Sequence, residues 1–123
     1  MAKVLIVDDS PTEVHILKGF LDKGGHDVLV AQDGKSGIEM AEAESPDLIL
    51  MDVVMPGVNG FQATRKLSRN DKTSAIPVIM VTTKNQETDR IWGMRQGAVD
   101  YLVKPVKEKS LMEKISEVLD KNS

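Results

Sequence analysis

Short, unbroken apolar runs alternate with longer amphipathic segments along the chain, and this alternation limits the possible folds more than any other feature. The five runs are Val4–Val7, Val28–Ala31, Leu48–Met51, Val78–Val81 and Tyr101–Val103. Because each run is continuous rather than alternating, it predicts a strand buried on both faces, as in a parallel sheet. The segments between the runs are long enough for crossover helices, so the pattern predicts five βα units and the α/β class.

Helix boundaries are marked by residue type. Ser10-Pro11-Thr12-Glu13 has the form of a capping box with proline at the first helical position, and Asn59-Gly60-Phe61-Gln62 has a cap of the same type. Asp33 follows the second apolar run and is interpreted as another helix cap. Gly97 suits the left-handed residue that closes a helix, and the last helix is predicted to end near Leu119.

The size and composition indicate one globular unit. The chain has 123 residues, 41% of them hydrophobic and 28% charged, with no internal repeat or linker. We therefore expect a single domain over residues 1–123 with no output domain. The output of this single domain is then expected to depend on docking with another protein. The absence of cysteine excludes disulfides and thiolate metal sites.

Charge and hydropathy exclude further classes of protein. The net charge is -3, with no long run of Lys or Arg, which argues against a nucleic-acid-binding surface. The first apolar run is only four residues long before two carboxylates, too short for a signal peptide or a membrane span. We therefore expect a cytoplasmic protein with no membrane insertion.

Candidate site residues follow four of the five predicted strands. Asp8 and Asp9 follow the first, Asp52 the third, Thr82 the fourth and Lys104 the fifth. Open α/β sheets bind ligands at the carboxyl ends of their parallel strands. These side chains are therefore predicted to share one small site at one edge of the sheet.

Three carboxylates in one site are energetically unfavourable without a cation. Two of them about 4 Å apart repel each other by roughly 4 kcal/mol at an effective dielectric near 20. A divalent ion would relieve this repulsion, and hard oxygen ligands without Cys or paired His favour Mg²⁺ or Mn²⁺ over zinc. A single Asp after a strand is usually a turn former or a helix cap. The combination with Thr82 and Lys104 favours a functional interpretation.

At these positions the chain resembles the receiver domains of two-component response regulators. The matching segments are Val4-Leu-Ile-Val-Asp8-Asp9-Ser10, Leu48-Ile-Leu-Met-Asp52-Val-Val-Met-Pro56-Gly-Val-Asn-Gly60, Val78-Ile-Met-Val-Thr82 and Gly97-Ala-Val-Asp-Tyr101-Leu-Val-Lys104-Pro105. The resemblance extends from residue 3 to about residue 119. It implies a flavodoxin-like (βα)5 fold, a doubly wound parallel sheet with strand order 2-1-3-4-5.

The resemblance also assigns a metal site and a phosphoacceptor. Asp52 matches the aspartate that takes a phosphoryl group from a histidine kinase. Asp9 matches the direct Mg²⁺ ligand, and Asp8 matches the acidic partner that acts mainly through water. The backbone carbonyl of Val54 matches the third protein ligand, and Mn²⁺ is expected to substitute for Mg²⁺.

Three further residues match the groups that respond to phosphorylation. Thr82 matches the switch hydroxyl, Lys104 the cation that pairs with the phosphoryl group, and Tyr101 the aromatic residue that turns inward on activation. Lys104-Pro105 matches a peptide bond that is often cis. The implied output is a change in the face built from the fourth helix, fifth strand and fifth helix, which docks a downstream protein. Such a module is not a conventional enzyme, since it catalyses only its own phosphotransfer and autodephosphorylation.

Several alternatives stay open at this point. A binding-only pseudo-receiver would keep the fold without the chemistry, although every residue the chemistry needs is present. The segments Asn59–Arg65 and Thr73–Asp89 resemble receivers of twitching-motility systems, which work with chemotaxis-type histidine kinases in type IV pilus control. The alternative pathway is flagellar chemotaxis. Trp92, the only tryptophan, is interpreted as belonging either to the core or to a docking face.

Overall fold

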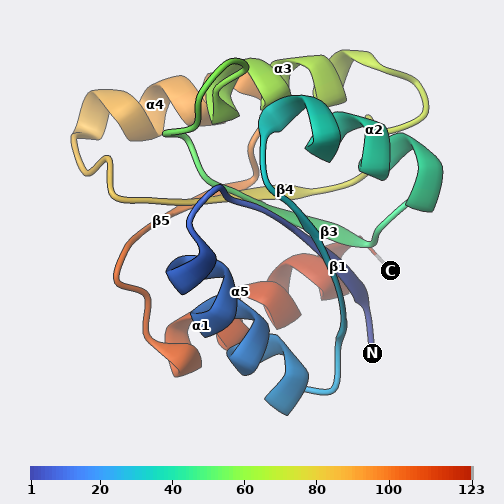
Figure 1. The fold of residues 1–123 in the computed structure, drawn as a ribbon, viewed down its shortest axis with the longest axis vertical. Coiled ribbons are helices and arrows are strands. Elements are labelled where there is room, and N and C mark those ends of the chain that lie inside the picture. Colours follow the sequence, from blue (N-terminus) through green and yellow to red (C-terminus); the bar gives the residue numbers. More distant parts are fainter. Residues whose placement is uncertain (123) are drawn as a thin grey trace.

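A five-stranded parallel sheet separates two layers of helices (Figure 1). The computed structural model describes residues 1–122. The strands are β1 (Lys3–Val7), β2 (Asp27–Ala31), β3 (Leu48–Met51), β4 (Val78–Thr82) and β5 (Asp100–Val103), in the order β2-β1-β3-β4-β5. This confirms the α/β class and the strand order of a flavodoxin-like fold.

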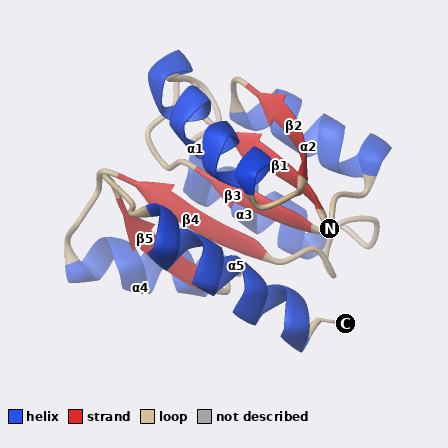
Figure 2. Ribbon diagram, turned by 90° about the horizontal axis from the view of Figure 1, so that it is seen from below, coloured by secondary structure: helices blue, strands red, loops and turns tan. Residues whose placement is uncertain are grey.

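The helices are divided between the two faces of the sheet. Two of them, α1 (Pro11–Lys23) and α5 (Glu108–Lys121), cover one face, and three cover the other: α2 (Gly34–Glu44), α3 (Gly60–Arg69) and α4 (Glu87–Gln96) (Figures 1 and 2). Among the described residues, no helix is long and apolar enough to cross a membrane.

The three inner strands are buried on both faces, as their sequences predict. Along β1, Val4 and Ile6 belong to the core shared with α1 and α5, whereas Leu5 and Val7 belong to the core beneath α2 and α3. The prediction of two fully buried faces is wrong for β2 and β5, where only Ala31 and Tyr101 are buried and the other residues are partly buried or exposed. These two strands are the edges of the sheet, so one side of each has no neighbouring strand.

The helix caps follow the sequence closely, with one correction. Asn59 and Gln62 form a reciprocal capping box at the start of α3, and Asp33 caps α2 by accepting from the Ser36 N–H. Ser10 caps α1 by accepting from the Glu13 N–H, but its own N–H donates to Asp8 Oδ1 at 2.9 Å. The predicted box at Ser10 is therefore only half formed, because Asp8 takes the place of the Glu13 carboxylate.

The predicted carboxyl ends of the helices also agree with the structure, with small differences. Gly97 closes α4 in the left-handed conformation with a φ of 117°, which favours glycine. The last helix continues to Lys121, slightly beyond the predicted end near Leu119.

The start of α3 packs directly against the carboxyl end of β3. A Cβ atom at Gly60 would collide with the backbone carbonyl oxygen of Asp52 and with Val53. Glycine therefore allows the helix to approach the strand end closely. This packing holds the backbone of Asp52 and Val53 in place beside the edge where the strands end.

Candidate functional site

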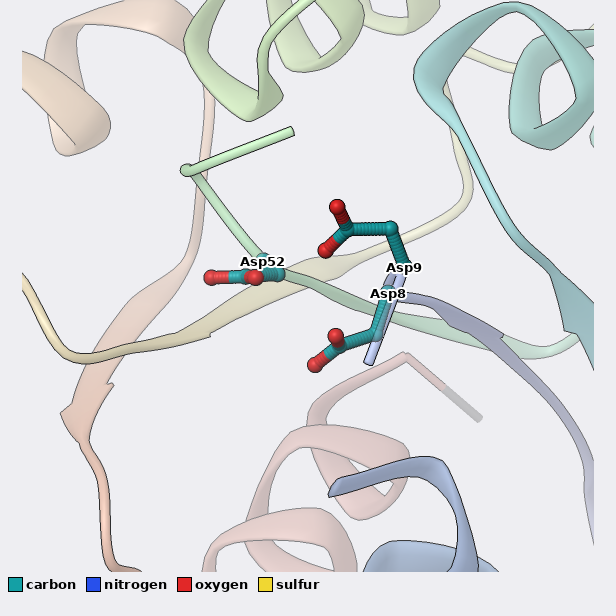
Figure 3. A group of neighbouring side chains, drawn as sticks. All are labelled: Asp8, Asp9 and Asp52. Atoms are coloured by element: carbon teal, nitrogen blue, oxygen red, sulfur yellow. The ribbon is translucent and has the colours of Figure 1, made fainter. Parts of the chain in front are cut away.

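Three carboxylates meet at the carboxyl edge of the sheet. Asp8 and Asp9 follow β1, Asp52 follows β3, and one carboxylate oxygen from each lies within 4.8 Å of the others. Figure 3 shows the three side chains gathered at this edge. Asp8 and Asp52 are buried, at 2% and 7% exposure, whereas Asp9 is exposed to solvent. The parallel register of β1 with β3 explains the meeting, since it aligns Val7 with Met51, the last residue of each strand.

Lys104 lies beside the carboxylates at the end of β5. Its Nζ is 2.7 Å from Asp8 Oδ2 and 3.7 Å from Asp52 Oδ2, and its side chain is only 6% exposed. The peptide bond between Lys104 and Pro105 is cis. Glu13 Oε2, at 4.0 Å, is a further acidic neighbour of this ammonium group. The sequence indicates only a helix-cap role for Glu13, and no local signal in it predicts this approach to Lys104.

The surroundings of Asp52 disfavour an isolated negative charge. Burial raises the pKa of the Asp52 carboxyl above its ordinary value, and the nearby charge of Asp8 acts in the same direction. Lys104, hydrogen bonding by Thr82 and the Val53 N–H oppose this rise in pKa. The Val53 N–H donates to Asp52 Oδ1 at 2.8 Å. An added cation would therefore stabilise the ionised form of Asp52.

The donor set fits a hard divalent cation. The three candidate ligand groups are all carboxylates, and the cluster includes no histidine. Oxygen ligands of this kind suit Mg²⁺ or Mn²⁺, and a small number of carboxylates leaves coordination positions for water and substrate oxygens. The exposed side chain of Asp9 lies on the solvent side of the cluster, where an ion would enter.

Thr82 and Tyr101 form the next layer of the site. Thr82 is fully buried at the end of β4, and its Oγ1 accepts from the Lys84 N–H at 3.4 Å. Tyr101 is 8% exposed and packs with Val53 and Met80. Its hydroxyl donates to the Lys84 carbonyl at 2.8 Å. The structure thus places Tyr101 in an inward position, hydrogen-bonded to the loop that follows Thr82.

The remaining candidate residues lie at the surface. The side chain of Val54, two residues after Asp52, is 55% exposed. Trp92 lies on α4 and is 47% exposed, so it belongs to the surface rather than the core. Ile91 on α4 and Val103 on β5 are exposed to a similar degree. Lys84 forms an ion pair with Asp89 of α4, which sequence reasoning did not anticipate.

A known protein family matches almost the whole chain. The family model for the response regulator receiver domain matches residues 4–116 of the chain. The chain belongs to this family. Members of the family are signalling modules that histidine kinases phosphorylate and that interact with downstream partners. They bind Mg²⁺ in an acidic pocket, and this receiver has the corresponding cluster of aspartates.

Individual relatives are similar to this chain over nearly its whole length. Protein PilH of Pseudomonas aeruginosa is 60% identical over 119 residues, which cover 97% of this chain and 98% of PilH. The chemotaxis protein CheY4 of Vibrio cholerae has a crystal structure with a TM-score of 0.90 and 31% identity, covering 96% of this chain and 98% of that one. The receiver domain of the sensor histidine kinase PA1611 from P. aeruginosa, solved with magnesium in its active-site cleft, has a TM-score of 0.90 and 28% identity, covering 97% of this receiver and 98% of that chain.

Proposed function

We propose that this receiver is a stand-alone response regulator that takes a phosphoryl group from a chemotaxis-type histidine kinase onto Asp52. The observation that carries the proposal is the meeting of three carboxylates within 4.8 Å, with the Lys104 ammonium 3.7 Å from Asp52. A stand-alone role is supported by PilH, which matches this chain over 98% of its own length. We place the reaction in the cytoplasm, because histidine kinases draw the phosphoryl group from ATP.

The chemistry begins with attack by a carboxylate oxygen of Asp52 on the phosphorus of a phosphohistidine. The new O–P bond forms as the P–N bond breaks, and the imidazole leaves. Negative charge spreads over the three equatorial oxygens during this transfer. Lys104, the Thr82 hydroxyl and nearby backbone N–H groups stabilise this charge. Hydrolysis of the resulting acyl phosphate by water releases inorganic phosphate and restores the Asp52 carboxylate.

A divalent ion completes the site in this proposal. Asp9 would ligate it directly, Asp8 would act mainly through water, and Asp52 and the backbone carbonyl of Val54 would supply the other protein ligands. When bound, Mg²⁺ or Mn²⁺ supplies positive charge that offsets the carboxylates and the incoming phosphoryl oxygens. Lys104, which contacts Asp8 at 2.7 Å, is close enough to turn toward the phosphoryl group.

Output would come from the face formed by α4, β5 and α5. Thr82 moves toward the phosphoryl group, and the space it leaves favours the inward position of Tyr101. Phosphorylation would thereby increase the population of an arrangement that the protein already adopts. The exposed apolar side chains of Ile91, Trp92 and Val103 give this face the character of a docking surface for a downstream protein.

Intact mass after incubation with acetyl phosphate and Mg²⁺ tests the phosphoacceptor role. The wild type should gain the mass of one phosphoryl group, and Asp52→Asn should gain none. Asp33→Asn is the matched control, because Asp33 also follows a strand but caps α2 away from the carboxylate cluster. Unmodified wild-type protein would instead favour a binding-only pseudo-receiver.

For the pathway, we propose type IV pilus control and twitching motility, supported by the 60% identity to PilH. The alternative is flagellar chemotaxis, which is supported by the structural likeness to the chemotaxis protein CheY4. Expression in P. aeruginosa lacking PilH separates them. Restored twitching zones, abolished again by Asp52→Asn, are the expected result; altered swimming with no effect on twitching would favour the flagellar alternative.

A further inference from the structure

Helix α3 carries an unpaired group of cations. Its sequence contains Arg65, Lys66 and Arg69 and no acidic residue. Within residues 1–122, none of these three side chains has an ion-pair or hydrogen-bond partner. Arg65 and Arg69 are four residues apart, so their guanidinium groups lie on the same side of the helix. Like charges at this spacing slightly destabilise a helix, so side-chain interactions within α3 do not explain the pair.

A groove runs beside these cations. It has a volume of about 520 Å³ and is lined by Gly57, Val58, Gln62, Arg65, Lys66 and Arg69. Favourable interaction with the helix dipole accounts for Lys66 and Arg69 in the last turn, but not for a groove next to them. Val58, which is partly buried, provides an apolar contact on the groove wall. The groove therefore combines a small apolar surface with three cationic side chains.

This groove is separate from the aspartate site and from the face formed by α4, β5 and α5. None of the candidate site residues lines it. In Figure 1, α3 lies between α2 and α4 in the layer opposite α1 and α5. The protein as a whole has a net charge of -3, so this group of cations is a local exception to its overall charge.

We propose that the α3 groove binds an acidic segment of a partner protein. Carboxylates of that segment would pair with Arg65 and Arg69, whose planar guanidinium groups bind carboxylates in a two-pronged geometry. Lys66 would add a third charge contact, and an apolar side chain of the segment would pack on Val58. Arginine is also enriched at protein interfaces, where lysine is depleted.

A second copy of this chain is a less suitable occupant. Its acidic helical side chains are largely engaged within the chain already. The intramolecular contacts are Glu44 with Lys3, Glu42 with Asn70, Glu87 with Arg90, Glu108 with Lys23, Glu113 with Lys109, and Glu117 with Lys114 and Lys121. Self-association through these carboxylates would require breaking such contacts first.

Nucleic acid is also disfavoured as an occupant. The groove lining contains no aromatic side chain on which a base could stack. Only three cations are available along one helix, and the net negative charge of the protein repels a polyanion at longer range.

Titration with a fluorescein-labelled synthetic peptide of Glu, Asp and Leu tests the proposal. The wild type should bind it, and amide resonances of Gly57, Val58 and the last turns of α3 should shift most in a nitrogen–proton correlation spectrum. The triple variant Arg65→Glu, Lys66→Glu, Arg69→Glu should bind at least about tenfold more weakly. Phosphorylation of this variant by acetyl phosphate should match the wild type, which also shows that it folds.

The matched control changes the same number of cations elsewhere. Lys23→Glu, Lys109→Glu, Lys121→Glu alters side chains that are 73%, 89% and 75% exposed, and it should retain wild-type affinity. Equal loss of binding in both triple variants would overturn the proposal, because net charge alone would then explain binding. It would also be overturned by the absence of wild-type binding, by dimerisation through α3 in sedimentation velocity, or by tighter binding of a DNA oligonucleotide to the same groove.

Discussion

The ion pair between Lys104 and Asp8 is the least solvated charge contact of the site. The two side chains are 6% and 2% exposed, and their charged atoms are 2.7 Å apart. Asp9, on the same cluster, is exposed and has no ion pair with Lys104. Adjacent aspartates thus have different physical roles, because one stabilises a buried cation and the other mainly adds repulsion between carboxylates.

These roles predict opposite effects of two neighbouring substitutions in metal-free buffer. Asp8→Asn should lower the free energy of unfolding by about 1–3 kcal/mol, because Lys104 loses the charge of its closest partner. Asp9→Asn should raise it by up to about 1 kcal/mol, since a like charge is removed near Asp52. Urea unfolding in the presence of EDTA measures both, and each variant serves as the other's control. A change of the same sign in the two variants would contradict the assignment.

Tyr101 offers a second measurement on a single residue. Burial raises the pKa of its hydroxyl to about 12, and the charges of Asp89 and Asp52 add to the rise. Tyr101 is the only tyrosine, so the absorbance of tyrosinate follows this group alone. The folded protein should titrate well above the urea-unfolded chain, whose midpoint should lie near about 10.

The same shift in pKa links folding to pH. Between about pH 10 and pH 12 the unfolded chain loses the Tyr101 proton while the folded chain retains it, so stability should fall as pH rises through this interval. Below this interval the group is protonated in both states and its contribution is constant. Tyr101→Phe should show a smaller fall over the same range. Identical pH dependence in the two proteins would show that Tyr101 ionisation is not responsible.

At the scale of elements, the seating of α3 on β3 depends on the absence of a side chain at Gly60. Gly60→Ala should destabilise the protein by about 2 kcal/mol or more, because its Cβ would collide with the carbonyl oxygen of Asp52. Gly19→Ala is the matched control within α1, where a Cβ meets nothing within 4 Å. It should stabilise the fold by up to about 1 kcal/mol through helix propensity. Thermal unfolding of the two variants distinguishes the effects, and equal changes would contradict the packing argument.

Elements were predictable from sequence where local rules decide them. The strands, the cap at Asn59 and the helix end at Gly97 follow from apolar runs and residue preferences within a few positions. Incomplete burial of β2 and β5 does not follow from their apolar runs, and only the strand order implied by the family resemblance places these two strands at the edges of the sheet. The pairing of Lys104 with Asp8, 96 residues apart, depends on side-chain geometry that strand order alone does not determine. For the same reason, the approach of Glu13 to Lys104 and the inward position of Tyr101 emerged only from the structure.

At the scale of the whole molecule, one sheet separates regions with different chemistry. The carboxyl edge holds the aspartates, α4 and β5 expose apolar side chains, and the α3 groove gathers unpaired cations. Because α3 begins against Asp52 and Tyr101 contacts Val53, both surfaces are connected by packing to the loop after the proposed phosphoacceptor. An ion that binds these aspartates only in the folded state should raise the free energy of unfolding of the whole domain.

Magnesium should reverse the stability order of two variants. Without metal, Asp9→Asn should melt above the wild type, since it relieves carboxylate repulsion. With Mg²⁺ at about 100 times its dissociation constant, the wild type should gain about 2.7 kcal/mol through binding to the folded state alone. Asp9→Asn should gain much less, because it lacks the proposed direct ligand, and it should then melt below the wild type.

A control of equal charge removes the simplest alternative explanation. Asp27→Asn also deletes one negative charge, but from an exposed position on β2 outside the aspartate cluster. It should gain as much stability from Mg²⁺ as the wild type does, because its ligand set is intact. Differential scanning calorimetry over a series of MgCl₂ concentrations gives all three curves. If the curves for Asp9→Asn and Asp27→Asn rise in parallel, Asp9 is not a ligand, and the ion acts only by general screening of a negatively charged protein.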